Sequence, residues 1–143
     1  MDKRKIFNDC PSVSTLCLGT VNFGTKLPEE DALHQLDYFF ENGGNFIDTA
    51  NVYGRWDSSG EPLSEQVIGK WLKERKVRSE VVISTKGGHP DLSSMDIPRL
   101  SEKEIREDIE SSLRSLGTDY IDIYFLHRDD QEKPVEEILG ILE

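Results

Sequence analysis

Short apolar runs rich in β-branched residues alternate along the chain with longer segments whose apolar residues recur every three or four positions. The short runs predict strands at residues 15–19, 45–48, 80–85 and 120–127. Alternating strands and helices are typical of repeated βα units around a parallel sheet. The predicted fold class is therefore α/β.

The helical segments carry their own start and stop signals. The first helix is predicted to begin at Pro28 and to end before Gly43, because proline suits the first helical position and glycine ends a helix. A second helix follows Pro62, and its apolar stripe includes Trp71, which we expect in the core.

The third helix is the best marked. Ser101 and Glu104 form a capping box, Leu100 and Ile105 staple across it, and Gly117 ends the helix. A fourth helix is predicted from residue 134, and the printed sequence ends before any stop signal.

Composition excludes some partners. The chain has 143 residues, with 17 basic and 28 acidic ones, and its net charge of -11 repels phosphate backbones and anionic lipids. We therefore expect no nucleic-acid and no membrane partner. The acidic surplus, concentrated in the helices around residues 65–80 and 102–110, is expected to be solvated surface.

The two cysteines, Cys10 and Cys17, lie close together in the sequence and match neither a disulfide framework nor a metal site. We expect free thiols in a reducing compartment. The N-terminal segment has no continuous apolar run, which argues against a signal peptide or a spanning helix. A cytoplasmic protein is predicted.

Ionisable residues lie at the ends of three predicted strands: Asp48 and His127 end theirs, and Lys86 immediately follows one. Asp48, Lys86 and His127 are spaced by about one βα repeat each, so a parallel sheet would bring them to the same rim. Taken singly, Asp48 is explained as a turn residue, Lys86 as an exposed lysine and His127 as a structural histidine. Their coincidence at successive strand ends favours a catalytic cluster.

Tyr53 is the fourth candidate, because its loop can fold back over that rim. A nearby ammonium such as that of Lys86 would make a phenol a better proton donor, and Asp48 could hold Lys86 in place. His127 would then donate to a substrate oxygen on which negative charge develops. Trp56 is either part of the substrate pocket or an exposed loop anchor. His89 could lie near Lys86, although a loop histidine usually has no such role, and His34 is expected to be a solvated or packed surface residue of the first helix.

Four ordered segments carry a family resemblance: residues 18–24, 43–54, 83–86 and 115–122. Together they resemble successive signatures of the aldo-keto reductases. The similarity is closest to the bacterial oxidoreductases related to aryl-alcohol dehydrogenases and to the potassium-channel β-subunits.

The resemblance implies a (β/α)8 barrel of the TIM type and reduction of a small aldehyde or ketone by NADP(H). It implies that Tyr53 is the general acid, that Lys86 and Asp48 tune it, and that His127 orients the carbonyl. It also implies that Gly19, Thr20 and Asp48 lie near the nicotinamide ribose, with no metal. The family lacks the Gly-rich dinucleotide fingerprint, and so does this sequence.

Such barrels close eight strands over roughly 250 residues. Only four strands are predicted here, so we expect residues 1–143 to form one incomplete domain, the N-terminal half of a barrel truncated after about four βα units. Without the other half, we expect weak cofactor affinity or none. If these residues are the whole polypeptide, the exposed half-barrel edges would favour a homo-oligomer; the alternative is that they are one piece of a longer protein, and the sequence does not decide between the two.

Three functions are compatible with these residues. The first is the NADPH-dependent carbonyl reductase, and the second is a truncated, non-catalytic binding or regulatory module. The third is an unrelated barrel enzyme that uses Lys86 as a Schiff-base nucleophile, which leaves Tyr53 and the Gly-Thr-Val-Asn-Phe-Gly turn unexplained. The identity of the substrate and the choice between NADP and NAD stay open.

Overall fold

Strands and helices alternate through most of the molecule. The computed structural model describes residues 1–6, 11–57 and 59–142. The strands are β1 (Lys3–Arg4), β2 (Val13–Ser14), β3 (Leu18–Gly19), β4 (Phe46–Asp48), β5 (Val82–Gly87) and β6 (Ile123–Leu126). The helices are α1 (Glu29–Glu41), α2 (Leu63–Arg75), the 3-10 turn η1 (Arg78–Glu80), α3 (Glu102–Leu116) and α4 (Val135–Leu142).

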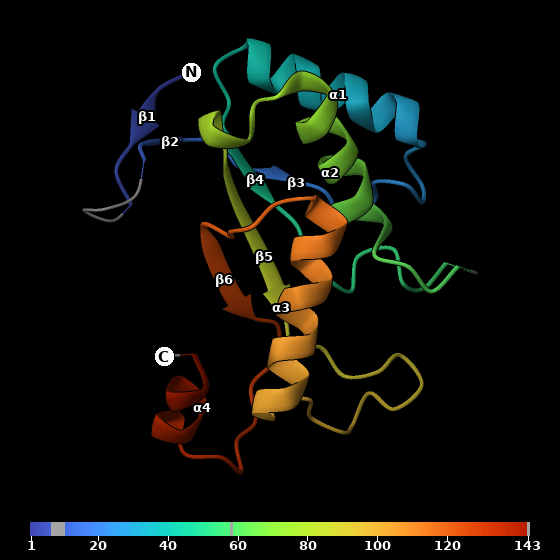
Figure 1. The fold of residues 1–143 in the computed structure, drawn as a ribbon, viewed down its shortest axis with the longest axis vertical. Coiled ribbons are helices and arrows are strands. Elements are labelled where there is room, and N and C mark those ends of the chain that lie inside the picture. Colours follow the sequence, from blue (N-terminus) through green and yellow to red (C-terminus); the bar gives the residue numbers. More distant parts are fainter. Residues whose placement is uncertain (7–10, 58, 143) are drawn as a thin grey trace.

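The main sheet has the strand order β3-β4-β5-β6, and each neighbouring pair is parallel. Helices α1, α2 and α3 lie along one face of this sheet, while α4 lies beyond the lower end of β6 (Figure 1). The α/β class is confirmed. Because all four strands run the same way, their carboxyl ends and the loops that follow them gather at one rim.

Local sequence signals set the helix boundaries. At α3 the Ser101 hydroxyl accepts a bond from the Glu104 N–H, the Glu104 carboxylate accepts from the Ser101 N–H, and Gly117 closes the helix at a φ of 63°. The capping box is confirmed. Pro28 stands at the cap, one residue before α1, instead of in its first turn, whereas α2 follows Pro62 as predicted.

The first strand differs from its prediction. Residues 15–17 form no strand, and the extended segments on either side of them are β2 and β3. β2 pairs with β1 in an antiparallel hairpin that the sequence pattern did not predict. The hairpin is held to the sheet by Asn45, whose side-chain oxygen accepts from the Ser14 N–H at 2.7 Å.

The core lies between the sheet and helices α1 and α2. Its largest fully buried side chains include Trp71, Leu36, Ile68, Ile47 and Ile83. Trp71 is a core residue, as predicted, and its indole N–H donates to Asp37 at 2.8 Å. Each fully buried aliphatic side chain stabilises the fold by about 1.5–3 kcal/mol, so this layer anchors the strands that carry the rim.

The acidic surplus is not all solvated. Glu65 of α2 is fully buried and Asp108 of α3 is 7% exposed, although both belong to segments that we expected to be surface. Each has polar partners, since Glu65 accepts from Thr85 at 2.6 Å and Asp108 pairs with Arg99 at 3.1 Å. The prediction was wrong at these two positions because polar partners from other parts of the chain, β5 and the loops after β4 and β5, surround the two acids.

Two findings concern the expected environment of the chain. No helix among the described residues is long and apolar enough to cross a membrane. Cys17 is a free, exposed thiol, whereas Cys10 lies outside the described residues.

Candidate active site

An ion pair between Lys86 and Asp48 lies at the carboxyl end of the sheet. The Nζ of Lys86 is 2.7 Å from Oδ2 of Asp48 and 2.6 Å from the carbonyl oxygen of Thr49. Ser84, two residues before Lys86 on β5, donates to Oδ1 of Asp48 at 2.7 Å. Adjacent parallel strands therefore bring Asp48 and Lys86 into direct contact across a long sequence separation.

Tyr53 and His127 complete the cluster. The Tyr53 hydroxyl is 3.5 Å from Nζ of Lys86, and its ring centroid is 6.0 Å from that of His127. His127 follows β6 directly, and its backbone N–H donates to the carbonyl of Gly87 at 2.7 Å. The structure thus gathers all four candidate catalytic residues at one rim.

The environment of His127 disfavours its charged form. Burial is the main cause that lowers its pKa from 6.5 to about 4, and the positive charges of Lys86 and Arg128 act in the same direction as His89, while Asp48 opposes them. The Nδ1 atom of His127 is buried and has no hydrogen-bond partner. At neutral pH the ring is therefore neutral, with one N–H donor.

The residues expected near a cofactor differ in what they offer. Gly19 is exposed at the end of β3, and a Cβ at this position would meet no atom within 4 Å, so a flat ring could approach the backbone here. Thr20 is fully buried, and its hydroxyl donates to the carbonyl of Asp48 at 2.9 Å. Asp48 keeps lone pairs for a ribose hydroxyl beside its bonds to Ser84 and Lys86. Gly19 and Asp48 fit the nicotinamide end of such a cofactor, whereas buried Thr20 holds the backbone of Asp48 in place through this hydrogen bond.

A buried polar network lies behind the rim. Asn51 donates from Nδ2 to Glu65 at 3.3 Å and to Ser112 at 3.1 Å, which joins the loop after β4 to helices α2 and α3. Burial raises the pKa of Glu65, and its hydrogen bonds to Thr85, Ser112 and Asn51 only partly oppose that effect. The loop that carries Tyr53 is therefore attached to the core.

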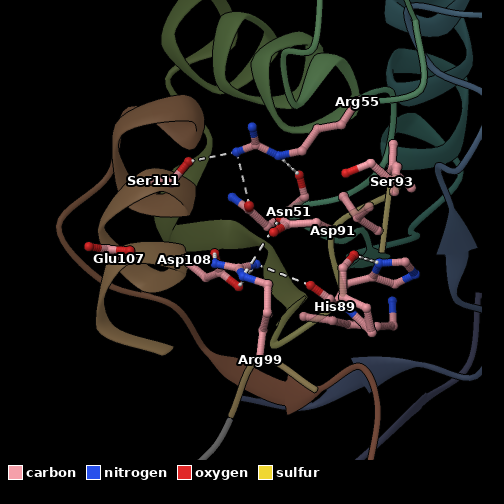
Figure 2. Close-up of a pocket in the computed structure, with 14 residues that line it drawn as sticks. Asn51, Arg55, His89, Asp91, Ser93, Arg99, Glu107, Asp108 and Ser111 are labelled. Atoms are coloured by element: carbon pink, nitrogen blue, oxygen red, sulfur yellow. Dashed lines mark hydrogen bonds and ion pairs between the residues drawn. The ribbon is translucent and has the colours of Figure 1, made fainter. Parts of the chain in front are cut away.

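A cavity of about 530 Å³ lies beside this network, between α3 and the loop after β5. Figure 2 shows Arg55 reaching across its upper part toward Ser111 and Asn51, with Arg99 and Asp108 paired below. Arg55 donates to Ser111 at 3.1 Å and to the Asn51 carbonyl at 2.8 Å. Lys86 and His89 also line the cavity, so it adjoins the candidate catalytic residues.

Sequence reasoning missed several contributors to the site. Ser84 was detectable, because it shares a strand face with Lys86, yet it was not singled out. Glu65 and Arg55 carried no signal, since an acid on a helix and an arginine in a loop are ordinarily solvated. His89 was treated as a loop histidine, but its ring centroid lies 4.7 Å from that of His127.

These observations define a class: a parallel βα assembly of the barrel type, with an Asp, Tyr, Lys and His cluster at the carboxyl ends of its strands. Comparison with known proteins agrees with this class. Residues 15–143 match the model of the aldo/keto reductase family, and the chain belongs to that family.

Individual relatives support the assignment. The chain is 42% identical over 131 residues to the uncharacterized oxidoreductase YrpG of Bacillus subtilis, covering 88% of this chain and 40% of that protein. It is 37% identical over 143 residues to norsolorinic acid reductase B of Dothistroma septosporum, covering 91% of this chain and 35% of that protein. The aldo-keto reductase AKR11C1 of Bacillus halodurans, solved in its holo form, superposes with a TM-score of 0.79 at 33% identity.

The chain spans less than half the length of these relatives. The superposition on the Bacillus halodurans structure includes 99% of this chain but only 45% of that protein. The similarity therefore confirms the predicted barrel type of fold, with the first βα units described here.

Proposed function

We propose that this chain supplies the acid-base residues of a carbonyl reductase that converts aldehydes or ketones to alcohols with NADPH. The proposal rests on the contact of Tyr53 with the Lys86–Asp48 ion pair, at 3.5 Å from Nζ of Lys86, beside His127. The relatives named as reductases support the reaction class, and the holo form of the Bacillus halodurans neighbour supports a bound cofactor.

The surroundings of Lys86 favour a charge-tuning role. An ammonium has three N–H donors, and Nζ lies near three acceptors, in Asp48, Thr49 and Tyr53. A Schiff-base nucleophile must instead present a free amine to its substrate. The positive charge stays beside the phenol, where it stabilises the phenolate left after proton transfer.

Tyr53 and His127 then act on the same substrate oxygen. When bound, reduced nicotinamide supplies a hydride to the carbonyl carbon. The Tyr53 hydroxyl gives its proton to the oxygen, and the neutral imidazole of His127 donates a hydrogen bond to it while negative charge develops. Gly19 and Asp48 would hold the nicotinamide end, and Asp48 also fixes Lys86.

Titration with NADPH, followed by an aldehyde panel, tests this function. Cofactor or tryptophan fluorescence reports binding, and loss of reduced-cofactor absorbance reports turnover. Tyr53→Phe should lower turnover by at least about 10²-fold while cofactor binding is kept, because general-acid catalysis contributes about 10²–10⁴-fold. Tyr38→Phe makes the same chemical change on the exposed face of α1, where Tyr38 is 72% exposed, and should leave turnover unchanged.

Other outcomes point to the other functions. NADPH binding without turnover of any carbonyl compound would favour the binding or regulatory module. A substrate adduct trapped on Lys86 by borohydride would contradict the reductase and support the Schiff-base enzyme.

The edge strand β6 supports a proposal of self-association for residues 1–143 taken by themselves. Phe125 on β6 is 49% exposed, and β6 pairs with β5 on one side only within the described part of the chain. Unpaired strand edges beside apolar side chains favour association. Sedimentation should show an oligomer, and a well-folded monomer at low concentration would refute self-association.

The cytoplasmic location stays a prediction, which cell fractionation would test.

A further inference from the structure

His89 packs directly against a candidate catalytic residue. The ring centroids of His89 and His127 are 4.7 Å apart, and the two ring planes meet at 83°. Such an edge-to-face arrangement brings the electropositive edge of one ring to the other. This contact has no place in the proton transfer described above.

Three hydrogen bonds, made by His89 and the neighbouring Gly88, hold His89 in this position. Arg99 donates to the His89 carbonyl at 3.1 Å, and Asp108, the ion-pair partner of Arg99, accepts from the Gly88 N–H at 2.8 Å. Figure 2 shows His89, Arg99 and Asp108 beside the same cavity. The His89 ring makes its own bond, from Nδ1 to the carbonyl of Pro90 at 2.7 Å. Because a carbonyl only accepts, Nδ1 of His89 carries the hydrogen.

The buried Nδ1 of His127 constrains where that ring carries its proton. If the proton were on Nδ1, an N–H donor would be buried without an acceptor, which is rarely tolerated in folded proteins. A proton on Nε2 leaves Nδ1 as a bare acceptor and gives the ring tip a donor. In the charged form both nitrogens are donors, so one would again be unpaired.

We propose that His89 is a positioning residue for His127, whose ring it packs against so that the Nε2–H tautomer is kept and its N–H is presented to the substrate oxygen. The inference rests on the proposed function, because only a reductase uses that donor. The groups facing His127 are Tyr53 and His89 from the two loops, Lys86 from β5, Asp48 from β4 and the adjacent Arg128. Of these, His89 is the aromatic neighbour of His127 that lies outside the Tyr53, Lys86 and Asp48 cluster.

Nuclear magnetic resonance of the histidine rings tests this role without cofactor or substrate. The ¹⁵N shifts of His127 distinguish the two tautomers, and its ¹³C shift followed against pH gives its pKa. The unaltered chain should show a single Nε2–H tautomer and a pKa of about 4. His34, on the exposed side of α1, provides an internal reference signal.

Two substitutions of His89 separate the effect of its ring packing on His127 from the effect of its charge. His89→Ala removes both, so the pKa of His127 should rise by about 1 unit or more and the two tautomers should mix. His89→Phe keeps an aromatic ring but removes the charge and the Nδ1–H bond to Pro90, so the pKa of His127 should rise less than in His89→Ala and its tautomer should be kept. The backbone amide spectrum shows whether each variant is folded.

The proposal is overturned if a folded His89→Ala variant keeps both the tautomer and the pKa of His127. If that variant does not fold, a His89→Phe variant with mixed tautomers would overturn it equally. Failure of the reductase assay leaves these spectra unaffected, so a refuted function and a refuted role for His89 give different results.

Discussion

Gly69 permits the close approach of two helices, and replacing it with alanine tests that contact. A Cβ at Gly69 of α2 would lie 2.3 Å from the Ser115 carbonyl oxygen and 2.9 Å from the Leu116 carbonyl carbon of α3. Ordinary carbon–oxygen contacts are about 3.3–3.6 Å, so the helices must separate by about 1 Å. Both obstacles are backbone atoms, which cannot rotate away.

The expected cost of Gly69→Ala follows from two opposing effects. Overpacking a tight interface costs about 1–3 kcal/mol, and we expect the upper end because backbone atoms must move. Alanine gains about 1 kcal/mol over glycine in a helix. The net result is a loss of about 2 kcal/mol in the free energy of unfolding.

Gly140→Ala is the matched control. Gly140 also lies within a helix, α4, but a Cβ there would meet nothing within 4 Å. Only the helix-propensity effect remains, so this variant should be as stable as the unaltered chain or more stable by up to about 1 kcal/mol.

Urea unfolding, followed by the fluorescence of buried Trp71 and by circular dichroism, measures both variants at one protein concentration. The reasoning fails if Gly69→Ala unfolds at the same or a higher urea concentration than the unaltered chain. Equal losses in Gly69→Ala and Gly140→Ala would also refute it, since the interhelical contact would then not be the cause.

Two further predictions concern buried ionisable groups. Glu65→Ala should cost about 3 kcal/mol, because Thr85 and Asn51 lose their buried acceptor, whereas Glu65→Gln should cost about 1 kcal/mol or less in urea unfolding at pH 7. The second prediction is that acidification from pH 7 to pH 4.5 stabilises the unaltered chain relative to Glu65→Gln. Burial raises the pKa of Glu65, so the folded state takes up a proton before the unfolded state does, and the free energy of unfolding rises as pH falls. The prediction is contradicted if the difference in unfolding free energy between the two chains is the same at both pH values. His127 has the opposite effect in both chains. Its pKa falls from 6.5 to about 4 on folding, so the folded state loses stability as pH falls below 6.5.

Local rules explain the parts of the fold that the sequence predicted. The ends of α3 follow from Ser101, Glu104 and Gly117, whose capping roles depend only on residues a few positions away. The meeting of Asp48 and Lys86 needed one more step, the assumption that neighbouring strands are parallel, and the strand register bears out that assumption.

Long-range packing explains what the sequence did not predict. Glu65 has the helical spacing and the chemistry of a solvated residue, and it is buried only because Asn51, Thr85 and Ser112 arrive from three other elements. His89 is similar, since its position depends on Arg99 and on an acid within α3. Neither partner set is visible in a window of neighbouring residues.

The placement of Tyr53 depends on Asn51, two residues earlier in the same loop. The Asn51 N–H donates to the Lys86 carbonyl at 2.9 Å, and its own carbonyl accepts from Arg55 at 2.8 Å. Its side chain accepts from Arg55 and donates to Glu65, so all four kinds of polar contact that asparagine offers are used. Aspartate would lose the side-chain donor and place a second acid beside Glu65, and leucine would leave all of these side-chain bonds unmade. The Tyr53 phenol therefore reaches Lys86 because Asn51 joins its loop to β5 through the backbone N–H and to α2 through the side-chain amide. For this reason strand-end spacing could identify Tyr53 but could not determine how its loop is held.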